Sequence, residues 1–198
     1  EYRFPQMELL REVPLDDAFF GEGVTRFGDR LFQLTWRAGR LFVYDAQSLE
    51  LQVSHPIPTE GWGITHDGHQ LIYSDGSHRL YRLDPHSLER LGVIEVTLNG
   101  RPLPRLNELE WIEGEIWANV FMANQLVRID PGSGAVTGIA DLRGLLPAAE
   151  RRNDTDVLNG IAWDAQHQAL WVTGKRWPWL YQIELRERVT PAGKTPRN

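Results

Sequence analysis

Cysteine is absent from the 198-residue sequence. Without thiols the chain has no disulfide, no thiolate metal ligand and no cysteine nucleophile, and the redox compartment stays open. Basic runs are also missing and the net charge is −6, so we expect no nucleic-acid partner. No apolar run approaches membrane-spanning length, so we expect no membrane insertion. The GxSxG, P-loop and HExxH signatures of common enzyme classes are not found.

Helical periodicity is scarce as well. The segment 141–152 is the only candidate for a helical turn or two, and it lies between repeats. The chain has instead many short segments rich in aromatic and β-branched residues, often alternating apolar with polar positions, as in RLFQLTW, RLYRLD and QLVRID. Segments of this kind predict an all-β protein.

An aspartate turn recurs about every 40 to 50 residues, in YDAQSLE, LDPHSLE and IDPGSGA. Asp45, Asp84 and Asp130 take the first turn position, which is typical of a type I turn. Each turn is preceded by a tight turn between two strands, such as RFGDRL, and by an opening element such as GEGVT or GWGIT. The order within a unit predicts a four-stranded antiparallel blade of a β-propeller.

Four such units begin near residues 22, 61, 107 and 159. The fourth unit lacks the Asp turn, and the segment MELLREVPL before the first unit predicts one outer strand of a further blade. We therefore expect a single β-propeller domain over residues 1–185 with its amino-terminal blade incomplete. A polar tail over residues 186–198 should follow it.

The unusual residues of the repeats fall at two places that a propeller brings together. The first strand of each blade lines the central channel, and the second runs antiparallel beside it, so the start of the first lies next to the end of the second. The starts of the first strands carry Phe20, Glu22, Glu60, Trp62, Asn107, Glu108 and Asn159. The ends of the second strands carry Trp36, Ser74, Asp75, Phe121 and Lys175. These polar and aromatic side chains should meet at one mouth of the channel and form a small-molecule or chain-end pocket.

Each of these residues also has an ordinary structural interpretation. A glutamate or lysine is most often a solvated surface residue, and an asparagine at a strand start can bind its own backbone turn. Trp36 and Trp62 stand at strand ends, where a pocket wall is favoured over core packing. Trp177, in the loop after Lys175, suits packing as well as ligand contact. The six histidines are scattered away from the pocket positions, so Glu22 and Lys175 would have to carry any proton transfer.

Four motifs carry a family resemblance, and they cover the chain from about residue 10 to 183: FGEGVTRFGDRLFQLTW, TEGWGITHDGHQLIYSDGSHRLYRLDP, LNELEWIEGEIWANVF, and LNGIAW with LWVTGKRWP. In this order they resemble the glutaminyl cyclases of the plant and bacterial type, the glutamine cyclotransferases. The resemblance implies a five-bladed β-propeller, of which four blades are visible here. It also implies an enzyme without metal or cofactor that converts the amino-terminal glutamine of peptides and proteins to pyroglutamate and releases ammonia.

By position, the resemblance makes Glu22 the essential acid–base group and gives Asn107 and Lys175 polar catalytic roles. The residues that it places around the substrate are Phe20, Trp36, Trp62 and Phe121. Phe121 stands where the family usually has a tryptophan, and an FTQG-like motif of an earlier blade has no match in the sequence. From the family we also expect a periplasmic or secreted protein. We further expect a monomer.

Two other functions fit the same pocket. A metal-dependent lactonase-like propeller would use Glu22, Asn107 and Asn159 as ligands of a divalent cation, although Lys175 would place a positive charge beside the ion. A non-catalytic propeller could bind a peptide at the same mouth. Metal analysis separates the first of these from a cyclotransferase, and a turnover assay separates the second.

Overall fold

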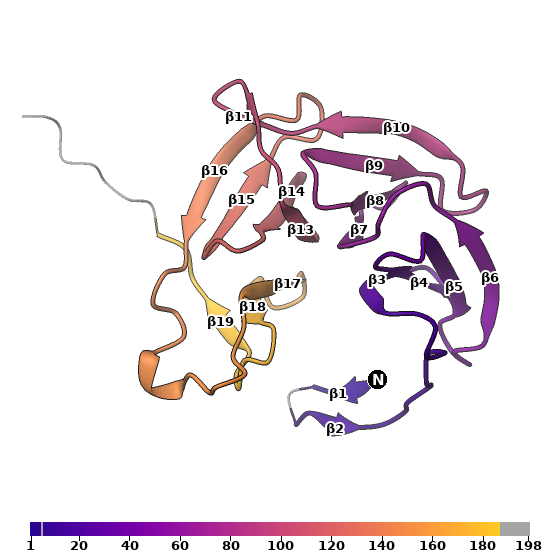
Figure 1. The fold of residues 1–198 in the computed structure, drawn as a ribbon, viewed down its shortest axis with the longest axis horizontal. Coiled ribbons are helices and arrows are strands. Elements are labelled where there is room, and N and C mark those ends of the chain that lie inside the picture. Colours follow the sequence, from indigo (N-terminus) through magenta and orange to yellow (C-terminus); the bar gives the residue numbers. More distant parts are fainter. Residues whose placement is uncertain (5, 187–198) are drawn as a thin grey trace, which may run out of the picture.

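Four antiparallel sheets are arranged around a central axis as the blades of a propeller (Figure 1). The computed structural model describes residues 1–4 and 6–186, so the tail expected over 186–198 lies, apart from its first residue, outside the described residues. The all-β propeller expected from the repeats is confirmed, and its four blades begin close to the expected positions. No helix in the described part of the chain is long and apolar enough to cross a membrane.

Within each blade the strands follow sequence order from the channel outwards. Blade 1 consists of β3 (Gly21–Phe27), β4 (Arg30–Thr35), β5 (Arg40–Asp45) and β6 (Leu51–Pro56). Blade 2 consists of β7 (Ile64–His66), β8 (Leu71–Ser74), β9 (Arg79–Leu83) and β10 (Arg90–Glu95). Blade 3 consists of β13 (Leu106–Ile112), β14 (Glu115–Val120), β15 (Gln125–Ile129) and β16 (Val136–Asp141). Blade 4 has three strands among the described residues: β17 (Leu158–Asp164), β18 (Ala169–Gly174) and β19 (Tyr181–Ile183).

The aspartate turns join the two outer strands of blades 1, 2 and 3. Asp45, Asp84 and Asp130 each accept backbone N–H bonds through Oδ1 from residues two or three positions later. The backbone carbonyl of each aspartate also accepts the N–H of the residue four positions later, which closes the turn. That residue has a left-handed backbone conformation, as at Leu88 (φ 63°) and Gly134 (φ 72°). The aspartate repeat found in the sequence therefore corresponds to the same set of turn hydrogen bonds in three blades.

The hydrophobic core lies between blades. One cluster joins blades 1 and 2 and includes Phe32 and Tyr73, both almost fully buried. A second joins blades 2 and 3 around Leu80 and Leu109, and a third joins blades 3 and 4 around Trp117. Because each blade is apolar on both faces, it is stabilised by its neighbours in the ring. Among the described residues, none of these clusters joins blade 4 to blade 1.

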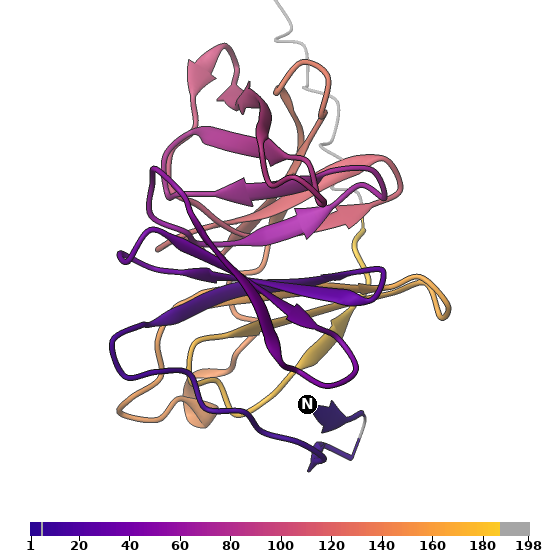
Figure 2. The same cartoon turned by 90° about the vertical axis from the view of Figure 1, so that its right-hand side faces the viewer.

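A small hairpin lies in the ring between blade 4 and blade 1 (Figure 1). It is formed by β1 (Tyr2–Arg3) and β2 (Glu8–Leu9), and Figure 2 shows it at the edge of the molecule. The ring of Phe4 meets Trp171 of blade 4 edge-on at 5.1 Å, and Arg11 donates to the Gln47 carbonyl of blade 1. The outer strand expected from MELLREVPL is thus two residues long, and it pairs with β1.

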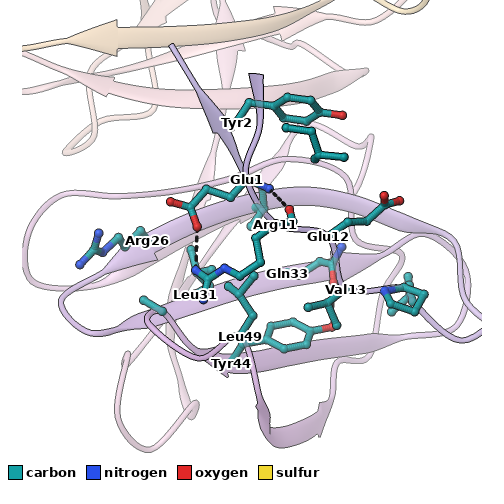
Figure 3. Close-up of a pocket in the computed structure, with 15 residues that line it drawn as sticks. Glu1, Tyr2, Arg11, Glu12, Val13, Arg26, Leu31, Gln33, Tyr44 and Leu49 are labelled. Atoms are coloured by element: carbon teal, nitrogen blue, oxygen red, sulfur yellow. Dashed lines mark hydrogen bonds and ion pairs between the residues drawn. The ribbon is translucent and has the colours of Figure 1, made fainter. Parts of the chain in front are cut away.

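A cavity of about 620 Å³ separates this hairpin from blade 1 (Figure 3). Glu1 and Arg11 close one side of it through an ion pair of 2.7 Å, and Val24 and Leu31 of blade 1 line another side. Val24 is 59% exposed. The face of blade 1 is therefore covered only in part by the hairpin.

The other irregular elements are short. A hairpin of β11 (Thr97–Leu98) and β12 (Arg101–Pro102) follows blade 2. The segment 141–152, expected to form a helical turn or two, has only a three-residue 3-10 turn at Ala148–Glu150. Gly144, with φ 85°, and Pro147, just before the turn, prevent a longer helix.

Candidate active site

A small cavity opens at the channel mouth, with a volume of about 190 Å³. Its lining consists of Phe20, Glu22, Trp36, Trp62, Asn107, Phe121 and Lys175. The structure thus brings together every residue that the sequence proposed as catalytic or substrate-binding. Their chemical roles stay predictions, whereas their convergence is a structural fact. Larger cavities lie beside the amino-terminal hairpin and beside β16, but the described residues that line these two do not combine a carboxylate, an amide, a lysine and aromatic walls.

Antiparallel pairing delivers these side chains to one end of the channel. Gly21 pairs with Thr35, Leu106 with Val120, and Leu158 with Gly174, so the start of each inner strand meets the end of its partner. In all three blades the register shifts immediately after this pair. A bulge at this place re-aims the next side chains. The residues in the bulges include Glu22, Asn107 and Asn159.

Two glycines bring neighbouring inner strands into backbone contact. Gly23 donates its N–H to the Trp62 carbonyl at 2.7 Å, and a Cβ at Gly23 would lie 2.7 Å from that oxygen. A Cβ at Gly63 would approach the backbone of Asn107 and Glu108 to well under 3.0 Å. These glycines are required for space, and the second glycine of the GEGV motif belongs to this contact.

A buried hydroxyl fixes blade 2 to blade 3 beneath the mouth. Ser74 accepts the N–H of Gly63 at 2.9 Å and donates to the Asn107 carbonyl at 2.7 Å. The backbone of Asn107 is therefore held from below, while its buried Oδ1 atom has no hydrogen-bond partner among the described residues. Among the described residues, Oδ1 accepts no bond from the turn backbone, so the turn-binding interpretation is not observed for this atom, which is left available as an acceptor for a ligand. Asn159, whose buried Oδ1 also has no hydrogen-bond partner in the described part of the chain, lies outside the lining of the cavity.

Glu22 has the electrostatic environment of an acid–base group. Burial raises the pKa of its carboxyl, the positive charge of Lys175 opposes this effect, and the negative charge of Glu60 adds to it. A carboxyl with a raised pKa exchanges its proton more readily near neutral pH than an ordinary glutamate does. The solvated-loop interpretation of Glu22 therefore does not hold.

The backbone that carries Lys175 is fixed from both sides. The N–H of Lys175 donates to the Val157 carbonyl at 2.9 Å, and its carbonyl accepts the N–H of Asp156 at 3.0 Å. The indole of Trp177 donates to the Asp156 carbonyl at 2.8 Å and packs directly on Gly174. Trp177 thus has the packing role left open by the sequence, and it stabilises the loop that presents the lysine.

The aromatic walls form two edge-to-face pairs. The Phe20 and Trp36 rings are 6.0 Å apart between centroids, and the Trp62 and Phe121 rings are 5.5 Å apart. The Lys175 ammonium lies 5.7 Å from the centre of the Phe121 ring. Phe121 therefore provides an aromatic face near the lysine.

Two further carboxyls lie on β13, below Asn107. Burial raises the pKa of Glu108 to about 7, where the charge of Glu22 adds to the effect and that of Lys175 opposes it. Burial likewise raises the pKa of Glu110 to about 7, although the N–H of Trp163 donates to this carboxyl at 3.3 Å. The sequence placed Glu108 at a strand start but gave it no role, and it did not single out Glu110. The alternation of acids in LNELE on a channel-lining strand is the signal that could have revealed both.

We expect these two glutamates to make the folded protein less stable as the pH rises. Both keep a proton in the folded state at pH values where an ordinary glutamate, with a pKa of 4.5, has lost it. Between about pH 4.5 and 7 the folded state therefore binds more protons, so the free energy of unfolding falls as pH increases. Thermal unfolding measured across this range should show a falling Tm, and Glu110→Gln should flatten the slope. The turn aspartates cannot cause this slope because hydrogen-bond donors lower their pKa below 3.8: mainly backbone N–H groups at Asp45 and Asp84, and first the Ser133 hydroxyl at Asp130. An unchanged slope in Glu110→Gln would therefore contradict the assignment.

The described residues contain no group of three or more histidine, aspartate or glutamate side chains arranged to hold a metal ion. Lys175 acts electrostatically on Glu22, so the set of Glu22, Asn107 and Asn159 that a lactonase-like site would require has a cation beside it.

Comparison with known proteins places the chain in a family. The family model for glutamine cyclotransferases matches residues 1–185. The chain belongs to the glutamine cyclotransferase family. It is 41% identical over 198 residues to a glutaminyl-peptide cyclotransferase of Arabidopsis thaliana, covering 98% of this chain and 61% of that protein. The chain therefore spans about three fifths of the length of this plant relative.

A solved structure supports the same family. The crystal structure of the glutaminyl cyclase of Myxococcus xanthus superposes with a TM-score of 0.79 at 34% identity, covering 84% of this chain and 72% of that one. The designed protein Ika4 superposes with a TM-score of 0.51 at 9% identity, covering 89% of this chain and all of the designed chain. At this low identity the likeness shows a similar fold and nothing about function. The family match does not favour the lactonase-like or the purely peptide-binding alternative.

Proposed function

We propose that the protein is a metal-independent glutaminyl-peptide cyclotransferase that converts the amino-terminal glutamine of peptides and proteins to pyroglutamate and releases ammonia. The observation that carries this proposal is the position of Glu22. Its carboxyl, with a raised pKa, shares an aromatic-walled cavity with Lys175 and Asn107. Both the name of the plant relative and the family match support the assignment.

The cavity suits the geometry of the reaction. Cyclisation requires the α-amine of glutamine to reach the carbon of its own side-chain amide, and holding the two together can lower the barrier by about 7–11 kcal/mol. Phe20, Trp36 and Trp62 surround a space of about 190 Å³, which is small enough to favour a folded side chain over an extended one. The aromatic walls thus supply the orientation.

Glu22 moves the proton. The amine must be neutral to attack, so the ionised carboxylate of Glu22 accepts a proton from the amine nitrogen as the new C–N bond forms. The protonated carboxyl then returns that proton to the amide nitrogen, the old C–N bond breaks, and ammonia leaves. Glu22 ends the cycle ionised, as it began, so no external acid or base is consumed.

Lys175 and Asn107 act on the amide oxygen. Negative charge develops on this oxygen in the tetrahedral intermediate, and placed donors stabilise such charge. The Lys175 ammonium provides a cationic donor, and the side-chain N–H groups of Asn107 provide a neutral one. Asn107 Oδ1, which has no hydrogen-bond partner among the described residues, can accept a hydrogen bond from the substrate. The tight backbone connections of both residues keep these donors in place.

A single assay tests the function. Incubation with a glutamine-initiated dipeptide is expected to release ammonia and pyroglutamyl product in equal amounts, with the same rate after treatment with a chelator. The matched control is the dipeptide with amino-terminal asparagine, whose side chain is one methylene too short to close a five-membered ring. Binding without turnover would favour the peptide-binding alternative, and loss of activity on chelation would favour a metal enzyme. A monomeric state and export to the periplasm or beyond stay predictions.

A further inference from the structure

Glu60 connects the two tryptophans of the cavity. It lies in the loop between β6 and β7, in the motif TEGWG. One of its carboxylate oxygens, Oε2, accepts the indole N–H of Trp36 at 3.0 Å and the indole N–H of Trp62 at 2.9 Å. A side chain outside the lining of the cavity thus holds two of its walls, which come from two different blades.

These bonds define what the tryptophans can offer a substrate. An indole has one hydrogen-bond donor and no acceptor. Because Glu60 takes both donors, Trp36 and Trp62 can contact a substrate only through their rings. Two charge-assisted bonds to one oxygen also restrict the ring orientations, since a rotation of either indole would break its bond.

Arg37 completes the arrangement on the outer side. Its guanidinium lies 3.7 Å from the second oxygen of Glu60 and 4.0 Å from the centre of the Trp36 ring. This exposed ion pair contributes little energy by itself because solvent screens it. Together with the cation–π contact, it keeps the Glu60 carboxylate turned toward the indoles.

Glu60 also acts on Glu22 through its charge. The negative charge of Glu60 raises the pKa of Glu22, whereas the positive charge of Lys175 lowers it. The charge of Glu60 therefore makes Glu22 a stronger base.

We propose that Glu60 is a positioning residue of the active site, which holds Trp36 and Trp62 around the folded glutamine. Its negative charge also acts on Glu22. This role rests on the proposed cyclotransferase function.

Two variants separate the hydrogen bonds of Glu60 to the indoles from the effect of its charge on Glu22. Glu60→Gln keeps an acceptor oxygen but removes the charge, whereas Glu60→Ala removes both. Glu89→Gln, at the Asp turn on the opposite side of blade 2, is a control for the loss of one exposed negative charge.

The kinetic experiment measures kcat, KM and the pH profile of kcat/KM with a glutamine-initiated dipeptide. Glu60→Ala should raise KM about tenfold, because two hydrogen bonds that orient the walls are lost, while Glu60→Gln should restore KM to within about threefold of the wild type. In both variants the acidic limb of the profile should move to lower pH, because the pKa of Glu22 falls when the Glu60 charge is removed. Glu89→Gln should change neither. An unchanged KM in Glu60→Ala, or an unmoved acidic limb in Glu60→Gln, would overturn the proposal.

A second readout does not depend on turnover. In ¹⁵N–¹H NMR spectra each tryptophan gives a separate indole N–H signal. The variants Trp36→Phe and Trp62→Phe identify the signals of the two indoles that bind Glu60. Glu60→Ala should shift these two signals and increase their exchange with water, Glu60→Gln should retain their protection, and the other indole signals should stay in place. If both signals are unaffected by Glu60→Ala, the positioning role is wrong.

If the wild type forms no pyroglutamate, the proposed function fails, and the dissociation constant of the dipeptide then takes the place of KM in the comparison. Should Glu60→Ala fail to fold, Glu60→Gln still tests the effect of charge.

Discussion

Replacement of Glu22 by glutamine is expected to lower kcat for pyroglutamate formation by about 10²- to 10⁴-fold, the usual contribution of a general acid–base group. An amide of the same shape cannot accept the proton of the attacking amine or return it to the leaving nitrogen. The substrate should still bind, because the aromatic walls are unchanged, so the loss should appear in kcat more than in KM.

The fold should tolerate this change. Burial disfavours the ionised form of Glu22 in the folded state, as its raised pKa indicates, so a neutral glutamine should leave Tm the same or slightly higher. Stopped-time assays of ammonia together with thermal unfolding measure both quantities. Glu89→Gln again provides the matched control, and it should keep wild-type turnover. Normal turnover in Glu22→Gln would remove Glu22 from the mechanism.

Replacement of Gly63 by alanine is expected to give the largest loss of stability. The added Cβ would collide with backbone atoms of Asn107 and Glu108, and backbone cannot move aside as the end of a flexible side chain can. Relief requires blades 2 and 3 to separate, which would also disturb the buried bonds of Ser74 to both strands. We expect a cost of about 3 kcal/mol, equivalent to a fall in Tm of roughly 6–12 °C for a chain of this size.

Gly92→Ala is the matched control for this change. Gly92 lies in β10, and a Cβ there would meet no atom within 4 Å. Its replacement should therefore change the free energy of unfolding by no more than about 0.5 kcal/mol. If Gly63→Ala were equally mild, the inner strands would not be in the close contact that the structure shows. The activity of Gly63→Ala should also fall, because Asn107 would be displaced.

Periodicity made most of the fold predictable. The aspartate turns and tight turns are local chemistry, so they can be recognised in the sequence without any knowledge of distant contacts. Once their order defines antiparallel blades, the topology alone places strand starts beside strand ends. This is why Glu22, Asn107 and Lys175 could be assigned to one mouth although they lie in three different blades. The helical turn expected over 141–152 was mostly wrong because glycine and proline interrupt that segment.

Contacts between blades were not predictable in the same way. Nothing in TEGWG indicates that Glu60 accepts a hydrogen bond from Trp36, which belongs to the preceding blade. Nor does the sequence show that burial raises the pKa of Glu108 and Glu110 to about 7, since burial depends on every strand around the channel. The partial covering of blade 1 by the β1–β2 hairpin is likewise a property of the assembled ring.

The sequence by itself therefore determined the blades, their order and the residues gathered at the channel mouth, because turns and strand alternation are short-range features that repeat. Only the tertiary structure decided how those residues act on one another. It made Gly23 and Gly63 indispensable for strand contact, turned the tryptophan donors toward Glu60, and gave Glu22 its raised pKa. These effects arise from distances between blades and from exclusion of water, which are set only when the ring is formed.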